Sequence, residues 1–227
     1  MTTTLGNLEA YSSAAIDNAA LLLEEASLLC ANEHYARAYF LAVAAIEETG
    51  KAVIAHNARG RNLCDPAVVS KVRNLLNDHT AKIRSAFIGF LVANPRGNAE
   101  PSAKLMVELQ RGREPSMYTD QAEDGSIQVP TKVVSTRASR DCVRLASACL
   151  TSARHHLETT APVKTSRAED QLFTLKSTQL TELMNTEDFW WYYIARMEAG
   201  DTDYAAAVVK YRNEYLRVGK AFKAEAP

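Results

Sequence analysis

Residues 8–30 have the sequence LEAYSSAAIDNAALLLEEASLLC, in which apolar side chains recur at intervals of three and four residues. This spacing puts them on one face of an α-helix. The face carries Ala15, Ala19, Leu22, Leu23, Ala26, Leu29 and Cys30. A polar break at Ala31-Asn32-Glu33 follows, and residues 34–57 form a second, alanine-rich helical stretch. We therefore expect an antiparallel helical hairpin.

Most later segments also have helical periodicity, and alternating runs of β-branched residues are almost absent. Asp65-Pro66 is typical of a helix start, because aspartate can cap a helix and proline fits its first position. Further helices are expected near residues 66–93, 102–110, 131–160, 167–184, 187–199 and 203–223. Residues 112–130 are loop-like, and the side chains expected to anchor this loop on the bundle are Met117, Tyr118 and Ile127. The sequence predicts an all-α fold.

The chain has 227 residues, enough for one generous domain or for one domain with an appendage. The best candidate boundary is Ala161-Pro162-Val163-Lys164-Thr165-Ser166, where the helical pattern is interrupted. We expect residues 1–160 to form a helical bundle and residues 161–227 to form a helical extension packed on it.

The composition, with 47% hydrophobic and 23% charged residues, is typical of a globular protein. A formal net charge of −1 excludes bulk attraction to nucleic acid, so any RNA site must be local. No stretch reaches the roughly 18 apolar residues of a membrane span. The N-terminus also lacks a basic segment followed by an apolar run. We expect a cytoplasmic protein that does not associate with membranes.

Metal-binding patterns are absent from the sequence. The four cysteines form no Cys-x-x-Cys pair and no short-spaced cluster with histidine, and no helix carries the Glu-x-x-His motif of di-iron bundles. Cys142 and Cys149 lie in an apolar-periodic segment and are expected to be reduced core residues. We expect neither a metal nor a cofactor.

Arg73 and His79 combine a permanent cation with a proton carrier that titrates near neutral pH. Alone, such residues are commonly solvated positions of a helix. Together they suit RNA cleavage, in which arginine holds a phosphate and histidine transfers a proton. On a continuous helix the six-residue separation leaves them roughly 120° apart in direction. A site assembled from two copies across a symmetric dimer would solve this problem.

Polar residues are concentrated around this pair. Asn74 and Asp78 are four residues apart and can meet on one helix face, while His79 and Lys82 are three apart on another. Such a concentration of polar residues is unusual for an amphipathic helix. It therefore favours a functional site over an ordinary solvated surface.

Glu47 and Glu48 precede Lys51 at spacings of four and three residues, which permits an ion pair on the helix surface. The alternative is that one glutamate lies at a helix seam and orients Arg73 or His79. Gly50 costs roughly 1 kcal/mol relative to alanine within a helix, so close packing against another helix would explain it.

Two further groups have a structural and a functional interpretation. Arg137, Arg140 and Arg144 form a stripe that is either a solvated face or a local patch for the RNA backbone. The aromatic run over residues 189–193 is too continuous for one helix face. Most of it should be core or subunit contact, although stacking on bases is an alternative.

The segment from about 21 to 130 resembles the AbiV abortive-infection proteins, a branch of the HEPN superfamily of helical proteins from prokaryotic defence and toxin systems. The most specific piece is Glu47-Glu48-Thr49-Gly50-Lys51, within Leu41–Lys51. The others are Leu21-Leu22-Leu23, His34-Tyr35-Ala36-Arg37-Ala38, Asp78-His79-Thr80-Ala81-Lys82, Ser116-Met117-Tyr118-Thr119-Asp120, Asp124-Gly125 and Pro130.

The resemblance implies a HEPN-like bundle, here with additional C-terminal helices, and a dimeric ribonuclease that needs no metal. In such proteins the ribose 2′-hydroxyl attacks the adjacent phosphate. His79 would then be the acid or base, Arg73 the phosphate stabiliser and Asn74 the orienting residue. The supporting residues are expected to be Glu47, Glu48, Lys51, Asp78 and Lys82.

Three functions follow as hypotheses. The first is an antiphage ribonuclease toxin that acts on tRNA, rRNA or mRNA as a homodimer, controlled by a phage-encoded trigger or an antitoxin. The second is a non-catalytic defence protein that arrests translation by binding a phage or host protein. The third is an antitoxin-like or scaffold partner of a separate nuclease.

Overall fold

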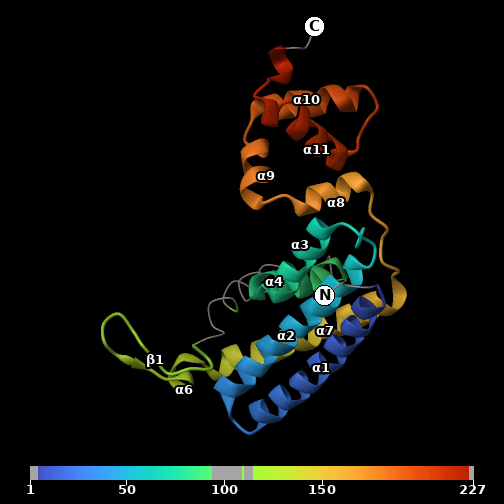
Figure 1. The fold of residues 1–227 in the computed structure, drawn as a ribbon. Helices are drawn as coiled ribbons and strands as arrows, with labels where there is room; N and C mark the ends of the chain where they lie inside the picture. Colours follow the sequence, from blue (N-terminus) through green and yellow to red (C-terminus); the bar gives the residue numbers. More distant parts are fainter. Residues whose placement is uncertain (1–4, 94–108, 110–114, 225–227) are drawn as a thin grey trace. The chain divides into compact units, whose positions relative to one another are not determined.

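The computed structural model describes residues 5–93, 109 and 115–224, and this part of the chain is almost entirely helical (Figure 1). The all-α prediction is confirmed. The longer helices are α1 (Leu5–Ala31), α2 (Tyr35–Ala58), α3 (Pro66–Asn77), α4 (His79–Ala93) and α7 (Thr136–Thr159). The shorter ones are α6 (Pro130–Val133), α8 (Arg167–Thr174), α9 (Ser177–Met184), α10 (Glu187–Glu198) and α11 (Tyr204–Glu214). Two short strands, β1 (Asp120–Gln121) and β2 (Ile127–Gln128), and two 3₁₀ turns, η1 (Leu216–Val218) and η2 (Phe222–Ala224), complete the description.

The chain forms two compact units. The bundle unit comprises Met1–Gly60 and Val72–Val163, and the C-terminal unit comprises Arg61–Lys71 and Lys164–Pro227. The domain boundary expected between residues 160 and 161 stays a prediction. Residues 61–71, predicted to belong to the first domain, group with the C-terminal unit.

The predicted hairpin of α1 and α2 is confirmed. The turn between them places Glu33 in the left-handed region, with φ of 64°. The His34 amide donates to the Leu29 carbonyl at 2.9 Å, which satisfies a carbonyl at the end of α1. The chain can therefore reverse directly after the polar break.

The core of the bundle unit is built around α2, which packs against α1, α4 and α7. Small side chains such as Ala42 and Ala45 are fully buried and let the neighbouring helices approach closely. Cys142 and Cys149 are buried and unpaired in this core, as predicted. Burial raises the pKa of the Cys149 thiol to about 12, which keeps it protonated and inert.

The helix expected over residues 66–93 is divided at Asp78, so the expectation of one continuous helix was wrong. Asp65 does cap α3, accepting the Ala67 amide at 2.8 Å. Asp78 acts in the same way for α4, accepting the Ala81 amide on its side-chain oxygen at 3.0 Å. A capping residue within a helical stretch starts a new helix, because its side chain takes over an amide at the new helix start.

The segment expected to be a loop contains an antiparallel hairpin of β1 and β2, with Gly125 at φ of 82° in its turn. The expectation that three side chains anchor it in the bundle was wrong. Met117, Tyr118 and Ile127 are 45%, 59% and 61% exposed. The helix expected at 102–110 lies, apart from Leu109, outside the described residues.

The helix expected over residues 131–160 is also divided. Val134 is extended after α6, and Ser135 caps α7 by accepting the Ala138 amide at 3.1 Å.

None of the described helices is both long and apolar enough to cross a membrane.

In the C-terminal unit, the stretches expected to be helical at 167–184 and 203–223 are interrupted. The first is α8 and α9, which are separated by Leu175 and Lys176. The second is α11 followed by η1 and η2. The core contains Leu183, Phe189, Tyr192, Val208 and Tyr211. Part of the aromatic run is therefore core, while Trp190 and Trp191 remain 39% and 45% exposed.

Asp170 ties residues 61–62 to the C-terminal unit. Its carboxylate is 4% exposed and accepts from the Arg61 guanidinium at 3.0 Å, the Asn62 amide at 2.9 Å and the Thr165 hydroxyl at 2.9 Å. The Arg61 guanidinium also lies 3.7 Å from the centre of the Phe173 ring. These contacts explain why a segment that precedes α3 groups with residues about 100 positions later.

Candidate functional site

Gly50 allows α4 to lie unusually close to α2. A Cβ atom at this position would come within 1.9 Å of the Lys82 carbonyl oxygen and 2.5 Å of its carbon. No real Cβ makes such a contact, so only glycine fits here. Close packing of Gly50 against another helix, expected from the sequence, is therefore observed.

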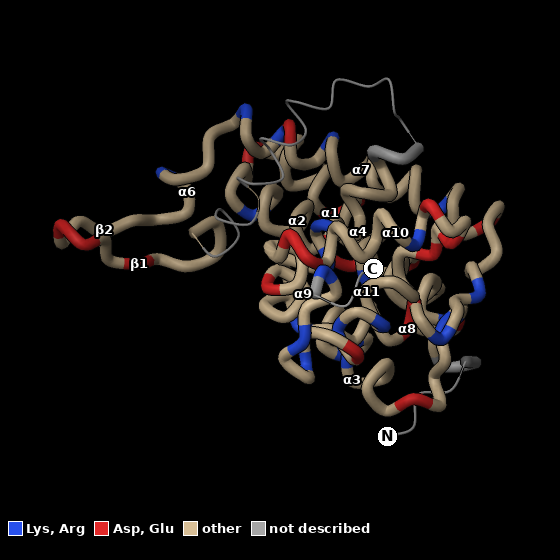
Figure 2. The backbone as a smooth tube through the Cα atoms, turned by 90° about the horizontal axis from the view of Figure 1, so that it is seen from above, with Lys and Arg blue, Asp and Glu red and all other residues tan. Residues whose placement is uncertain are grey.

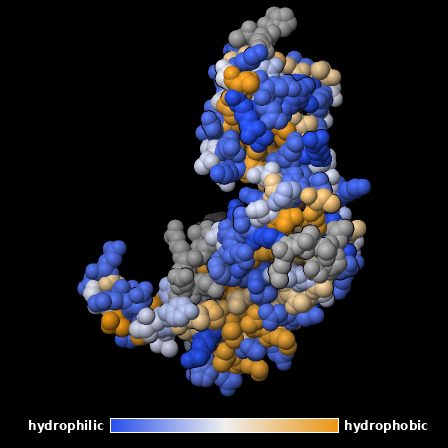
Figure 3. Space-filling model, in the orientation of Figure 1, coloured by the Kyte–Doolittle hydropathy of each residue, from blue (hydrophilic) through white to orange (hydrophobic). Residues whose placement is uncertain are grey.

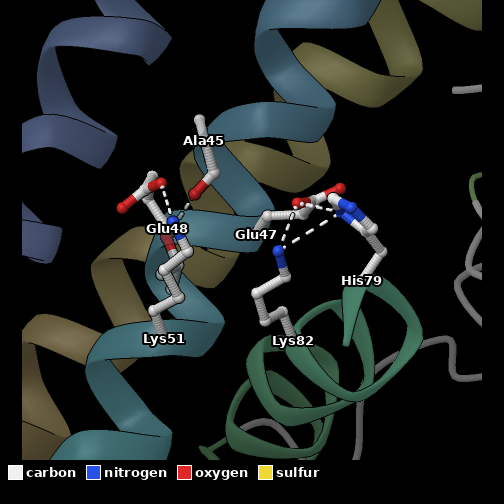
Figure 4. Close-up of polar contacts among 7 residues, drawn as sticks. Ala45, Glu47, Glu48, Lys51, His79 and Lys82 are labelled. Atoms are coloured by element: carbon white, nitrogen blue, oxygen red, sulfur yellow. Dashed lines mark hydrogen bonds and ion pairs between the residues drawn. The ribbon is translucent and has the colours of Figure 1, made fainter. Parts of the chain in front are cut away.

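Glu47 lies one turn before Gly50 and points from α2 towards α4 (Figure 4). Its Oε2 is 2.7 Å from His79 Nδ1 and 2.9 Å from Lys82 Nζ. The Glu47 and Lys82 side chains are 7% and 5% exposed, whereas the His79 side chain is 53% exposed. The three residues form what we call the seam triad: a buried ion pair with a histidine at its solvent edge.

The distances indicate which ring nitrogen of His79 carries the proton. Nδ1 is also 3.2 Å from Lys82 Nζ, but it cannot donate to a carboxylate and accept from an ammonium at once. The shorter contact is to Glu47, and an unprotonated Nδ1 at 2.7 Å from a carboxylate oxygen would be repelled. We therefore assign the proton to Nδ1, which leaves the Nε2 lone pair of the neutral ring available.

Lys82 compensates the charge of Glu47 in this buried position. A buried carboxylate without a cation would be costly, and two charges with good geometry offset much of each other's desolvation. The same carboxylate oxygen contacts both the ammonium and the imidazole, so Glu47 orients the imidazole ring while it is paired with Lys82.

Glu48 and Lys51 lie on another side of α2, away from the triad (Figure 4). They form the expected ion pair, with 2.5 Å between Lys51 Nζ and Glu48 Oε1. Burial alone would lower the pKa of Lys51, but the hydrogen bond to Glu48 and its charge outweigh burial and raise that pKa above its usual value. Glu48 and Lys51 therefore form the ordinary ion pair that was expected. Glu47 is the glutamate that lies at the helix seam.

Arg73 and Asn74 are exposed on α3. Within the described part of the chain, no hydrogen bond or ion pair joins either side chain to His79. The break at Asp78 places Arg73 and His79 on different helices, and Asp78 is occupied as the cap of α4. Hydrogen bonds and ion pairs thus join His79, Glu47 and Lys82 within one chain, and no such contact with Arg73 is found among the described residues.

The three arginines predicted to bind RNA are exposed along α7. Asp141 pairs with two of them, lying 3.6 Å from Arg137 Nε and in direct contact with Arg144. The Arg140 guanidinium lies 6.0 Å from the centre of the Tyr35 ring. Figure 2 shows basic and acidic positions interleaved along the chain. The stripe therefore keeps a local excess of positive charge, which Asp141 reduces by one.

Among the described residues, no group of three or more histidine, cysteine, aspartate or glutamate side chains is arranged to hold a metal ion. In the triad the one carboxylate is already paired with the Lys82 ammonium, 2.9 Å from Glu47 Oε2. The triad's donors therefore suit proton transfer better than metal binding.

Two contacts were not predicted from the sequence, the ion pair between Glu47 and Lys82 and a contact between two histidines. His56 on α2 is 4% exposed and packs edge to face on His156 of α7, with 5.6 Å between ring centres. No sequence signal marks this pair, because the two residues are one hundred positions apart. The contact between Lys82 and Glu47 could have been predicted only if it had been known that Gly50 faces α4.

The chain was compared with known protein families, curated proteins and solved structures. Residues 7–151 match the HEPN_AbiV family model, described as AbiV. The match contains both α2 and α4 and hence the whole seam triad. No curated protein and no solved structure matches the chain.

Proposed function

The chain belongs to the AbiV family of abortive-infection proteins in the HEPN superfamily, and from that premise we propose that it is a ribonuclease that cleaves RNA without a metal during antiphage defence. The observation that carries the proposal is the seam triad. It supplies an exposed imidazole with a set tautomer, held by a buried carboxylate 2.7 Å away.

The chemistry needs a base and an acid. Nε2 of His79 takes the proton of a ribose 2′-hydroxyl, whose oxygen then attacks the adjacent phosphorus. The bond from phosphorus to the 5′-oxygen breaks, and that oxygen leaves with a proton from the imidazolium or from water. The products are a 2′,3′-cyclic phosphate and a 5′-hydroxyl. Glu47 stabilises the imidazolium formed in between.

Arg73 completes the site in this proposal, with Asn74 orienting the phosphate. Because no hydrogen bond or ion pair joins Arg73 to His79 within the described part of one chain, the proposal places the arginine and asparagine of each site on the second subunit of a homodimer. A guanidinium offers two parallel donors to a phosphate and stabilises the charge that develops during attack. Arg137, Arg140 and Arg144 add a sequence-independent hold on the RNA backbone.

The decisive experiment is cleavage of single-stranded RNA by the purified protein in the presence of a chelator, with identification of the end groups. His79→Ala should lower the rate by about 10²–10⁴-fold, the usual contribution of a general acid or base. His155→Ala is the matched control, because His155 is an exposed histidine on α7 outside the triad. Cyclic phosphate ends and selective loss in His79→Ala would support the proposal.

Activity that disappears with the chelator, or that survives in His79→Ala, would contradict it. The assay should be repeated with extract from phage-infected cells, since a phage-encoded trigger or an antitoxin is part of the proposal. Phage protection by the His79→Ala variant in cells is the corresponding readout when no trigger is known.

One observation favours the non-catalytic alternative, in which the protein arrests translation by binding a phage or host protein. Helix α10 exposes four large apolar side chains, those of Trp190, Trp191, Ile194 and Met197. Exposed aromatic clusters are common at protein interfaces. Full phage protection by His79→Ala together with loss of protection on changing Trp190 and Trp191 to alanine would favour this function.

A further inference from the structure

A groove of about 640 Å³ lies between the first turns of α2 and the segment that carries the β-hairpin. One wall is formed by Ala36, Arg37 and Phe40, and the other includes Met117, Tyr118 and Pro130. Figure 1 shows α6 beside the same end of α2. The volume lies within the range of small-ligand sites. The groove is thus large enough for a nucleobase with its sugar.

The charge of the groove suits a phosphate. The described residues that line it include no aspartate or glutamate, and their one full charge is that of Arg37. Arg37 is exposed and has no ion pair or hydrogen bond with other described residues. A free guanidinium beside an apolar wall combines a phosphate contact with a surface for a flat ring.

The aromatic side chains are placed for contact with a base. Tyr118, which was expected to anchor a loop, is instead 59% exposed at the groove. Phe40 of α2 lines the same groove and is half-buried. Base stacking on an exposed aromatic ring tolerates any sequence, because every base has a flat face.

Along α2, the groove lies on the N-terminal side of the seam triad. Phe40 precedes Glu47 by seven residues, which is about two turns, or roughly 10 Å, on nearly the same face of the helix. A strand whose scissile phosphate lies at His79 can therefore continue along α2 towards Phe40. Apolar surface over the lower part of the bundle unit, where α1 and α2 join, is visible in Figure 3.

We propose that this groove binds a base of single-stranded RNA that flanks the cleaved nucleotide, with Tyr118 stacked on the base and Arg37 holding the phosphate. The inference rests on the proposed function, because it takes His79 as the cleavage point. A peptide is the competing occupant, but neither the isolated cation nor the position beside the triad calls for one.

The test measures binding to a fluorescent single-stranded RNA of mixed sequence, with its duplex as comparison, in full-length protein carrying His79→Ala to prevent cleavage. Tyr118→Ala should weaken single-strand binding about tenfold, and Tyr118→Phe should not. Arg37→Ala should reduce the slope of log affinity against log salt concentration by about one, because one phosphate contact fewer releases about one counterion fewer. The matched controls are Tyr11→Ala on α1 and Arg154→Ala on α7, both exposed residues outside the groove.

Unchanged affinity and salt slope in the groove variants would overturn the inference, while cleavage by the unsubstituted protein would still support the proposed function. Absence of both RNA binding and cleavage would instead overturn the function itself. Equal loss in the controls would show that the effect does not come from the groove. All substituted side chains are exposed, and circular dichroism would verify that the helices persist.

Discussion

Gly50 decides how closely α4 can approach α2. Gly50→Ala should destabilise the protein by about 1–3 kcal/mol, because the added methyl group meets backbone atoms that cannot rotate away. Chemical denaturation measures the free energy of unfolding. Gly89→Ala is the matched control within α4, where an added Cβ has no neighbour within 4 Å, and it should stabilise by about 0.5–1 kcal/mol. Equal stability of the two variants would mean that the helices are not in contact at Gly50.

His56 should make stability depend on pH. Burial lowers its pKa, and the neighbouring His156 and Arg59 lower it further, against the opposing effects of the Thr160 backbone and Glu9. In the unfolded chain histidine takes up a proton near pH 6.5, but folded His56 stays neutral. The free energy of unfolding should therefore fall as pH drops below about 6.5, because the unfolded state binds the extra proton.

His56→Gln should flatten this pH dependence, and His155→Gln, at an exposed position, should leave it unchanged. Thermal unfolding between neutral and mildly acidic pH is the measurement. The charged groups that face His56 or line the cavity beside it are Glu9 and Asp17 of α1, Arg59 after α2, and Arg154, His156 and Glu158 of α7. If stability depended on pH with the same slope in wild type and in His56→Gln, His56 would not be the source of the pH dependence.

The packing of α2 on α4 depends on a buried ion pair as well as on apolar contacts. Glu47→Gln should cost about 3–5 kcal/mol, because it leaves the Lys82 ammonium buried without its charge partner. The double variant Glu47→Leu with Lys82→Met should recover most of that loss. Denaturation of Glu47→Leu, Lys82→Met and the double variant gives the coupling free energy.

Glu48→Gln is the control for this cycle. Its carboxylate is only partly buried and pairs with Lys51 along the same helix, so its loss should cost less than about 1 kcal/mol. A coupling near zero between Glu47 and Lys82 would show that the pair adds nothing to the seam. Loss of cleavage in a double variant that is fully stable would separate the triad's chemistry from its packing.

Assembly of the whole molecule can be tested by mixing inactive subunits. If each site takes Arg73 from one subunit and His79 from the other, a dimer of Arg73→Ala and His79→Ala chains contains one intact site. Mixing after subunit exchange should restore about a quarter of wild-type cleavage, since half the dimers are mixed and each has one working site. Light scattering should show a dimer. No recovery in proven mixed dimers would place both residues of a site in one chain.

The sequence by itself determined the elements with a strong local signal. The hairpin of α1 and α2 follows from apolar spacing and one polar break, and the start of α3 follows from Asp65 and Pro66. Gly50 was identifiable because glycine is costly within a helix, so its presence needs a reason. Helix interruptions at Asp78 and Ser135 were harder, because each depends on one side chain that competes locally with the helix.

Only the tertiary structure decided which distant side chains meet. Glu47 and His79 are 32 positions apart, and their contact depends on the approach of α4 that Gly50 permits. The same holds for His56 with His156 and for Arg61 with Asp170, since no periodicity relates residues about one hundred positions apart. Helical spacing reports the face of one helix, whereas packing chooses which faces touch. The polar residues were therefore visible in the sequence, and their grouping into a site was not.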